Sequence, residues 1–285
     1  MFRFFVYVKV FFLRIRHYLL AFCVCTIFMG GIAPLDFYVD ERTRTEIFFS
    51  VQEPIFPGHW YGGQIRAEVE PLSRFERLRM IRILGKAFEK YPDRVISENL
   101  ERVYALRSMR FYGVAFGGTH SGKTVYLCDE EDNPYFTDSH IEGIFHHEFS
   151  SILKRTHPGF FNLREWEAVN APGFKYGNGG VNAIQNGQAS VKLDPACFNQ
   201  GFLSRYSKAS PEEDLNVFSQ YLFTGNDEFW TIVDNHPRIH KKAMILIGFY
   251  RKINPLFTED YFRRINNRQA AGIVKNEDIL SETDN

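Results

Sequence analysis

Apolar residues recur at intervals of three and four along several stretches of the chain, a spacing typical of amphipathic helices. The clearest stretch begins with Ser73 and Glu76, which have the spacing of a capping box at a helix start. A second capping pair, Ser139 and Glu142, opens a predicted helix over residues 140–156. The C-terminal half is therefore predicted to be mainly helical. Further helices are predicted over residues 94–106, from Ser210 and Pro211 onward with Glu213 completing a capping box, and over residues 237–253.

Short apolar bursts rich in aromatic and β-branched residues predict strands where turn-forming residues flank them. They occur as RFYGVAF and KTVYLC between residues 110 and 128, and as shorter pieces within residues 35–70. Residues 158–208 are rich in glycine, asparagine and aromatic residues and are predicted to be irregular. The combination predicts an α+β fold, in which a small mixed or antiparallel sheet packs on the helix over residues 140–156 and a mainly helical C-terminal subdomain follows.

The first 33 residues differ from the rest of the chain. Basic residues up to Arg16 precede an uncharged, mostly apolar run from Tyr18 to Ala33, which is the layout of an export signal. This run of about 16 residues is short for a membrane span, which needs roughly 20. Three forms stay open: a lipoprotein acylated at Cys23 or Cys25, a plain membrane anchor, and cleavage after Ala33. All three predict export to the cell envelope.

Composition narrows the class of partner. The 34 basic and 34 acidic residues leave no net charge, which argues against a nucleic-acid partner. With 45% hydrophobic residues, the chain has enough apolar material for a folded core. Cys128 and Cys197 belong to no C-x-x-C pair and are predicted to be buried free thiols. Residues 269–285 are predicted to form a disordered tail.

Residues Gly117 to Thr124 read GGTHSGKT and match G-x-x-x-x-G-K-[ST], the phosphate loop of nucleotide-hydrolysing enzymes. Such a loop works because it joins a strand to a helix whose N-terminus faces the phosphates. The residues that follow, VYLCDEEDNP, form a β-rich burst that runs into an acidic turn and a proline. We therefore predict a β-hairpin without a bound nucleotide, with residues 117–122 in the connection and Lys123 at the start of the return strand.

The helix over residues 140–156 carries His147 and Glu148, the first two letters of the His-Glu-x-x-His motif of zinc peptidases. In that motif positions i and i+4 share one helix face, so that two imidazoles meet the metal while the glutamate polarises the bound water. The fifth position here is Ser151, and serine is a poor zinc ligand. Because buried helix histidines are often held by a carboxylate or a carbonyl instead, a structural role for His147 stays open.

Other residues can be considered as replacement ligands. His146 is adjacent to His147 and points about 100° away around the helix. His157 follows ten residues after His147 and is the other alternative for a second imidazole. Glu213 and Asp214 lie in the first turn of a later helix and are candidates for a carboxylate ligand, although capping and the helix dipole also explain them.

Five segments taken together resemble the zinc-binding metallopeptidase family of exported lipoproteins from Bacteroidetes-type bacteria, often found beside outer-membrane glycan-import machinery. The resemblance covers about residues 72–255 and lies in the order and spacing of the segments. It implies a gluzincin-like domain, here over residues 34–268. The segments are FYGVAFGGTHSGKTVYL, IEGIFHHEFSSILKR, FNQGFLSRYS, PEEDLNVFSQYLF and RIHKKAMILIGFY.

The resemblance also implies roles for individual residues. His147 would be a zinc ligand, Glu148 the general base, and Glu213 or Asp214 the third ligand. The family's second imidazole has no counterpart, because Ser151 stands in its place. Either another histidine substitutes or the chain is a relative that keeps the scaffold without the catalysis.

Two functions follow. The first is a zinc-dependent peptidase of the cell envelope, in which metal-activated water attacks a peptide bond, with catalysis impaired by the incomplete motif. The alternative is a non-catalytic binding or accessory protein on the same scaffold, associated with envelope glycan or peptide uptake. Its partner would be a peptide, a protein or the glycan-import machinery, and its groove would be lined by Trp166, Phe174, Tyr176 and Trp230.

Overall fold

The computed structural model describes residues 36–52, 54–130, 133–225 and 227–265. The predicted signal or anchor over residues 1–33, with Cys23 and Cys25, lies outside the described residues, and so does the predicted tail over residues 269–285. Within the described part of the chain, no helix has both the length and the apolar character needed to cross a membrane.

In the described residues, seven strands form one mixed sheet with the order β1-β2-β4-β7-β6. The long strand β4 is central: its first half pairs in parallel with β2 and β7, and its second half pairs antiparallel with β3 and β5. Strand β6 pairs with β7 and forms one edge of this order. The strands are β1 (Phe37–Val39), β2 (Glu46–Phe48), β3 (Glu68–Pro71), β4 (Arg102–Phe111), β5 (Val114–Phe116), β6 (Gly118–Ser121) and β7 (Thr124–Cys128).

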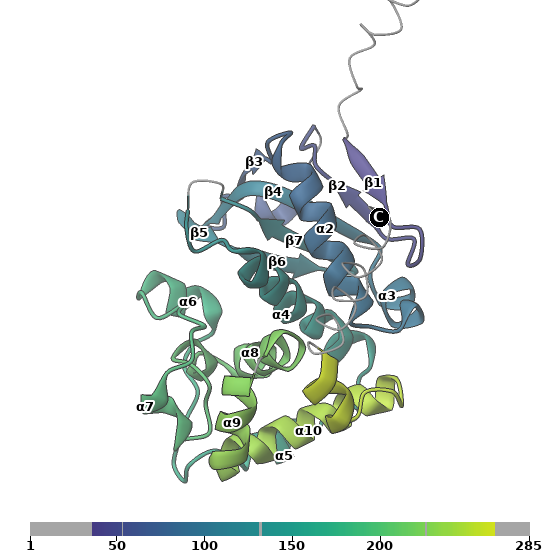
Figure 1. Ribbon diagram of the computed structural model, residues 1–285. Helices are drawn as coiled ribbons and strands as arrows, with labels where there is room; N and C mark the ends of the chain where they lie inside the picture. Colours follow the sequence, from purple (N-terminus) through teal and green to yellow (C-terminus); the bar gives the residue numbers. More distant parts are fainter. Residues whose placement is uncertain (1–35, 53, 131–132, 226, 266–285) are drawn as a thin grey trace, which may run out of the picture. The chain divides into compact units, whose positions relative to one another are not determined.

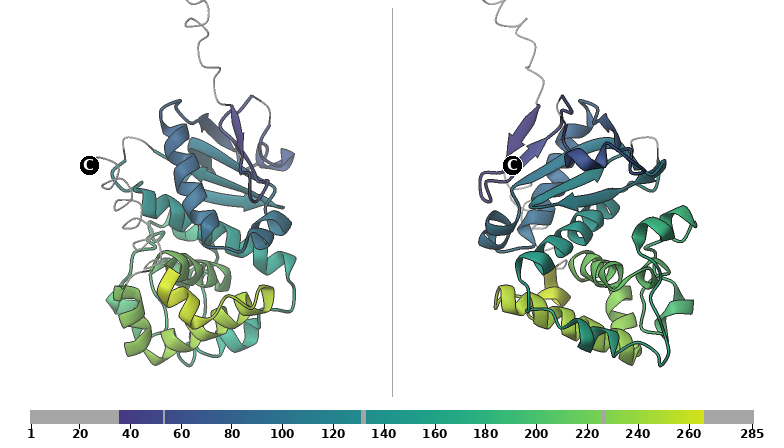
Figure 2. Two further views of the ribbon diagram at one scale, coloured as in Figure 1. Left: turned by 45° about the vertical axis from the view of Figure 1, so that its right-hand side comes forward. Right: turned by 180° about the vertical axis from the view of Figure 1, so that it is seen from behind.

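Helices cover one face of the sheet and build a further layer beyond it (Figures 1 and 2). Helix α4 contacts both β6 and β7 and, on its other side, α8, so that it separates the sheet from the C-terminal helices. The α+β fold with a mainly helical C-terminal region is therefore confirmed. The helices are α2 (Glu76–Glu89), α3 (Asp93–Asn99), α4 (Asp138–Thr156), α5 (Leu163–Glu167), α6 (Gly180–Gln185), α7 (Pro195–Phe198), α8 (Pro211–Thr224), α9 (Asp227–Asn235) and α10 (Pro237–Ile253), with 3-10 turns η1 (Gly58–Trp60) and η2 (Tyr206–Lys208).

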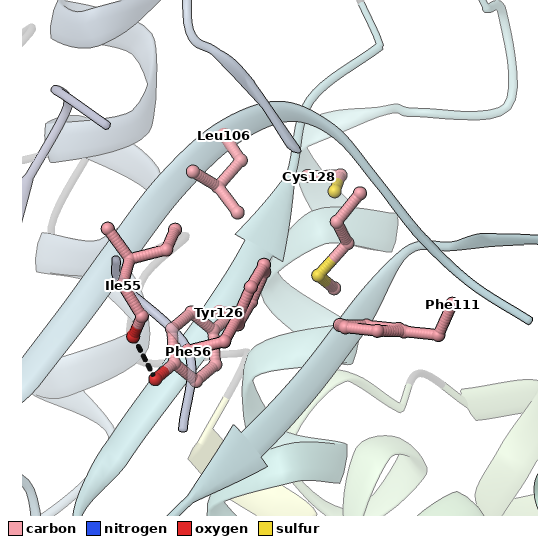
Figure 3. Close-up of a cluster of buried hydrophobic side chains, with 7 residues drawn as sticks. Ile55, Phe56, Leu106, Phe111, Tyr126 and Cys128 are labelled. Atoms are coloured by element: carbon pink, nitrogen blue, oxygen red, sulfur yellow. Dashed lines mark hydrogen bonds between the residues drawn. The ribbon is translucent and has the colours of Figure 1, made fainter. Parts of the chain in front are cut away.

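A compact apolar cluster packs around strands β4 and β7 and the segment before η1 (Figure 3). Phe56 contacts the rings of Tyr126 and Phe111, at centroid distances of 4.8 and 5.2 Å. Tyr126 Oη donates a hydrogen bond of 2.7 Å to the Ile55 carbonyl, so the phenol is satisfied although it is buried. Cys128 is a free thiol in this cluster, as predicted, and Cys197 is also free and buried.

The predicted helix over residues 94–106 is wrong in its second half. Helix α3 ends at Asn99, and β4 begins at Arg102. The segment RVYAL was assigned to the helix because its apolar residues also fit a helical interval. A central strand is buried on both faces, and the consecutive residues Ala105 and Leu106 are both buried here. Its sequence therefore lacks the alternation of apolar and polar residues that marks a half-buried strand.

Two of the three predicted capping boxes are corrected by the structure. Helix α2 starts at Glu76 with Phe75 at the cap position, so Ser73 is not the cap. Helix α4 is capped by Thr137, whose hydroxyl accepts a hydrogen bond from the His140 amide, and it therefore begins before Ser139. The third cap is confirmed: Ser210 Oγ accepts from the Glu213 amide at 3.1 Å, although the Glu213 carboxylate turns to another partner.

The GGTHSGKT segment is strand, turn and strand. Residues Gly118–Ser121 form β6, the chain turns at Gly122 with a φ of 57°, and β7 begins at Thr124. A strand therefore stands where a phosphate loop needs a helix, as predicted. The connection is shorter than expected, because residues assigned to it form β6, which pairs with β7. Lys123 lies in the turn and not at the start of the return strand, and RFYGVAF is divided between the end of β4 and β5.

Candidate functional site

Helix α4 presents His147, Glu148 and Ser151 to a cleft beside the edge strand β6. Two adjoining cavities of about 180 and 200 Å³ form this cleft. The first cavity extends toward Ile184 and Val191, and the second toward the start of α8. The residues that line both cavities are Phe116, Gly118, His147, Glu148 and Tyr206.

His147 is paired with a carboxylate from the first turn of α8. Its Nε2 donates to Glu213 Oε2 at 3.0 Å, and its ring stacks on Tyr206 with 6.0 Å between centroids. Burial alone would lower the pKa of His147, but the hydrogen bond to Glu213 and the charges of nearby glutamates outweigh it, and the pKa is raised. His147 is therefore stabilised as an imidazolium.

The backbone approaches this pair closely at Gly180, the first residue of α6. A Cβ atom added there would lie 2.3 Å from Glu213 Oε1 and 2.5 Å from the Tyr206 hydroxyl. A side chain at Gly180 would therefore displace both groups from the cleft.

Glu148 is paired with a histidine from β6. His120 Nδ1 donates to Glu148 Oε2 at 2.7 Å. Burial alone would raise the pKa of Glu148, yet the hydrogen bond from His120 and the neighbouring imidazoles lower it below its usual value. The carboxylate is thus held in its ionised form.

Close packing of β6 on α4 makes this second pair possible. A Cβ at Gly118 would lie 2.2 Å from Ile144 Cγ2, so glycine allows the strand to approach the helix. His120 lies two residues further along β6 and so shares the strand face of Gly118. The sequence analysis did not assign His120 to the site; the two-residue spacing from Gly118 was the available signal.

Ser151 occupies the place of the missing imidazole and is fully engaged with α8. Its hydroxyl donates to Glu212 Oε1 at 2.8 Å and accepts from Asn216 Nδ2 at 2.9 Å. Ser151 is almost entirely buried, with 1% of its surface exposed. It therefore links α4 to α8, and its hydroxyl proton is committed to a carboxylate.

His146 lies on the opposite face of α4, inside the core. Its ring stacks on Phe223 with 4.7 Å between centroids, Nδ1 accepts from the Tyr91 hydroxyl at 2.9 Å, and Nε2 lies 3.4 Å from Glu142 Oε1. Burial lowers its pKa to about 4, against the opposing effect of Glu142. His146 is thus a neutral core residue and does not supply a second imidazole beside His147.

The remaining candidates also lie elsewhere. His157 is the C-cap residue of α4, ten residues and about 15 Å along the axis from His147. Asp214 points away from His147 and accepts hydrogen bonds from Lys242 at 2.6 Å, Tyr176 at 2.7 Å and Trp166 at 3.0 Å. Of the two predicted carboxylates, only Glu213 is paired with His147.

The predicted aromatic groove is wrong. Trp166 is fully buried and Trp230 is 6% exposed, so both belong to the core. Phe174 and Tyr176 pack edge to face against each other and around Phe202. The aromatic residues of the cleft are instead Phe116 and Tyr206; the sequence offered no signal for Tyr206, which lies in the segment predicted to be irregular.

The donors around His147 do not fit a zinc ion. Among the residues that the structure describes, no three His, Cys, Asp or Glu side chains are grouped as metal ligands. His147 and Glu213 supply two donors, and Ser151, a poor zinc ligand that is hydrogen-bonded to Glu212, stands where the motif needs an imidazole. The predicted roles of His147, Glu148 and Glu213 in zinc chemistry therefore remain predictions without a matching ligand set.

Comparison with known proteins returns one class of relative. Neither a protein-family model nor a curated protein matches the chain. A crystal structure from Bacteroides caccae, described as "a putative zinc-binding metallo-peptidase", matches with a TM-score of 0.49 and 16% sequence identity, over 73% of this chain and 81% of that chain. The likeness concerns the arrangement of the elements alone.

Proposed function

We propose that this chain is a peptide-binding module on a metallopeptidase-like scaffold whose hydrolytic centre is not assembled. The observation that carries the proposal is the hydrogen bonding of the Ser151 side chain. Its hydroxyl is held between Glu212 and Asn216 at the position where a second imidazole would have to enter. The rival is the zinc-dependent peptidase, which needs at least three protein ligands.

The electrostatics of the cleft also favour binding over hydrolysis. A general base must be free to take a proton near neutral pH, and its pKa is best placed near the working pH. The carboxylate of Glu148 has a lowered pKa and accepts a proton-bearing nitrogen from His120. Glu213 is paired with His147 in the same way. Both carboxylates are thus held in hydrogen bonds with histidines of the cleft.

The shape of the cleft suits an extended peptide. Strand β6 is an edge strand, and an extended chain can pair with the backbone groups of such an edge. A further cavity of about 370 Å³ shares His140 and Gln220 with the first cavity, which continues the cleft along α4. From Ser151 to Ser139 the cleft follows twelve helical residues, or about 18 Å, which is the length of about five extended residues.

Attachment to the cell envelope is part of the proposal. Residues 1–33 combine a basic start with an apolar run, which supports export and attachment by acylation at Cys23 or Cys25 or by the run itself. A module attached in this way would present its cleft to peptides or to proteins of an envelope uptake system.

Binding can be tested with a fluorescein-labelled pool of random-sequence octapeptides and the full chain. Ala115 is exposed and lines the first cavity, so Ala115→Trp would fill the cleft without disturbing the core. We expect the wild type to raise the anisotropy of the pool and Ala115→Trp to abolish the rise. Ala168→Trp, at an exposed position that lines none of these cavities, is the matched control and should bind as the wild type does. Equal binding by Ala115→Trp would contradict the proposed cleft.

The zinc question has a test of its own. Ser151→His would place an imidazole on the face of His147, next to a cavity of about 200 Å³ that can receive it. We expect Ser151→His to bind zinc at least about a hundredfold more tightly than the wild type, measured by competition with a chromophoric chelator. Stoichiometric zinc in the purified wild type, together with peptide hydrolysis that Glu148→Gln abolishes, would establish the peptidase instead.

A further inference from the structure

Helix α2 carries an exposed apolar pair at its start. Phe75 is 89% exposed and Leu78 is 70% exposed, the highest values among the large apolar side chains of the described residues. The two residues are three positions apart and so lie on one side of the helix. Most of the other apolar residues of α2, among them Met80, Leu84 and Phe88, are buried on its opposite side. Core packing therefore does not explain Phe75 and Leu78.

The surroundings of this pair are basic. Residues 74–86 contain Arg74, Arg77, Arg79, Arg82 and Lys86 against a single acid, Glu76. Three of these basic residues are paired with acids: Arg77 with Asp36, Arg79 with Glu76, Asp129 and Asp138, and Arg82 with Asp138. Arg74 and Lys86 are exposed on the same helix. An apolar pair flanked by arginine and lysine is the composition of a helix face that rests on an anionic lipid surface.

The start of α2 lies near the first described residue of the chain. Arg77, in the first turn of α2, is 3.5 Å from Asp36, the first described residue. Ala33, where the apolar run ends, is three residues before Asp36 and can lie at most about 11 Å from it. Figures 1 and 2 show that the starts of β1 and of α2 share one end of the folded region, remote from α9 and α10.

We propose that the exposed side of α2 docks on an anionic membrane surface, with Phe75 and Leu78 at its start entering the interface and Arg74 and, in its last turn, Lys86 contacting lipid phosphates. Moving exposed apolar side chains out of water lowers the free energy of the protein–membrane system. Each arginine or lysine that approaches the negative surface lowers it further by electrostatic attraction. The inference rests on the proposed attachment of residues 1–33.

Hydroxyl-radical footprinting of the full chain in vesicles tests this surface. Oxidation is compared between phosphatidylcholine vesicles with and without phosphatidylglycerol. The lipid-free reference is the fraction of the chain that stays in solution in detergent-free buffer. We expect oxidation of Phe75 and Leu78 to fall several-fold in the anionic vesicles. Leu256, which is 61% exposed, and Tyr135, which is 65% exposed, are internal controls and should stay reactive.

A charge variant separates lipid contact from other causes of protection. Arg74→Glu should weaken the protection of Phe75 and Leu78 on anionic vesicles, whereas Arg251→Glu, in the last turn of α10, should not. Protection without lipid would mean that another part of the chain or a second copy covers the pair, and it would overturn the proposal. If the chain binds vesicles but Phe75 and Leu78 stay reactive, the proposal that α2 docks on the membrane is refuted, and the proposed attachment through residues 1–33 is kept. If the chain does not bind vesicles at all, both fail.

Discussion

The two faces of α4 place adjacent histidines in opposite chemical situations. On the cleft face, His147 is hydrogen-bonded to Glu213, and its pKa is raised. On the core face, His146 stacks on Phe223 and stays neutral, with a pKa lowered to about 4. A rotation of about 100° around one helix separates an ion pair in a cleft from a neutral ring in a core. Adjacency in the sequence is therefore no guide to membership of the site.

The charges on the two faces are also balanced differently. The core face contains a buried ion pair between Lys90 and Glu142, and Lys90 Nζ donates in addition to the Phe223 carbonyl at 2.8 Å. The cleft face pairs Glu148 with His120. The side chains of Glu142 and Glu148 are equally exposed, at 12%, so the two pairs differ in their cation partners: Lys90 is 4% exposed and His120 is 19% exposed. A buried charge that loses its partner has no water to replace it, whereas a group at a cleft can be solvated. The core face should therefore be far more sensitive to loss of a charge.

The same isosteric change on both faces gives the largest expected difference. Glu142→Gln leaves the Lys90 ammonium buried without its carboxylate and should lower the free energy of unfolding by about 4 kcal/mol. Glu148→Gln leaves behind His120, which is more exposed than Lys90, and should cost less, about 2 kcal/mol. Urea unfolding of the two variants at neutral pH measures both values. Equal losses would show that the two faces do not differ in solvent access.

The pH dependence of stability gives a second contrast. Because burial lowers the pKa of His146 to about 4, the unfolded chain binds a proton near pH 6.5 that the folded chain does not. This contribution to stability is present above pH 6.5 and is lost as the pH falls toward 4, by roughly 3 kcal/mol in total. We expect His146→Phe, which keeps a ring against Phe223, to remove this part of the pH dependence.

The measurement is the difference in unfolding free energy between the wild type and His146→Phe, taken from pH 7 down to pH 4. Asp129 must be considered in the same range, because burial raises its pKa to about 6 and gives a dependence of the opposite sign. Asp129 is present in both proteins, so the difference isolates His146. A constant difference across the range would contradict the neutral core state of this ring.

The sequence predicted the helix that carries the site because α4 has both a helical apolar interval and a proline-glycine end. It also pointed to the partner of His147, because Ser210 starts α8 and so puts Glu213 in the first turn. Local signals of this kind act within one element and can be read from spacing.

The rest of the site depended on contacts between elements. The pairing of His120 with Glu148 needs β6 to approach α4 at Gly118, and no local pattern specifies that approach. The bond between Ser151 and Glu212 likewise depends on how α8 docks on α4. The β4 segment was misread for a related reason, since burial on both faces removed the alternation that marks a strand.

The smallest expected effect concerns the coupling between the two faces. Glu213→Gln keeps an acceptor near His147 but removes a negative charge, so the pKa of His147 should fall from its raised value. A raised histidine pKa contributes stability that is present below pH 6.5 and is lost as the pH rises through the folded-state pKa. The variant should thus lose about 1 kcal/mol or less below pH 6.5 and nothing at high pH.

Ring resonances of the two histidines, followed by NMR across the pH range, measure this directly. The His147 resonance should titrate at lower pH in Glu213→Gln than in the wild type. The His146 resonance is the internal control, because its partners Tyr91 and Glu142 lie on the core face and are untouched by the change. If both titrations shift, removing the Glu213 charge changes the pKa of His146 as well as that of His147. The two sides of α4 would then not be independent electrostatic environments.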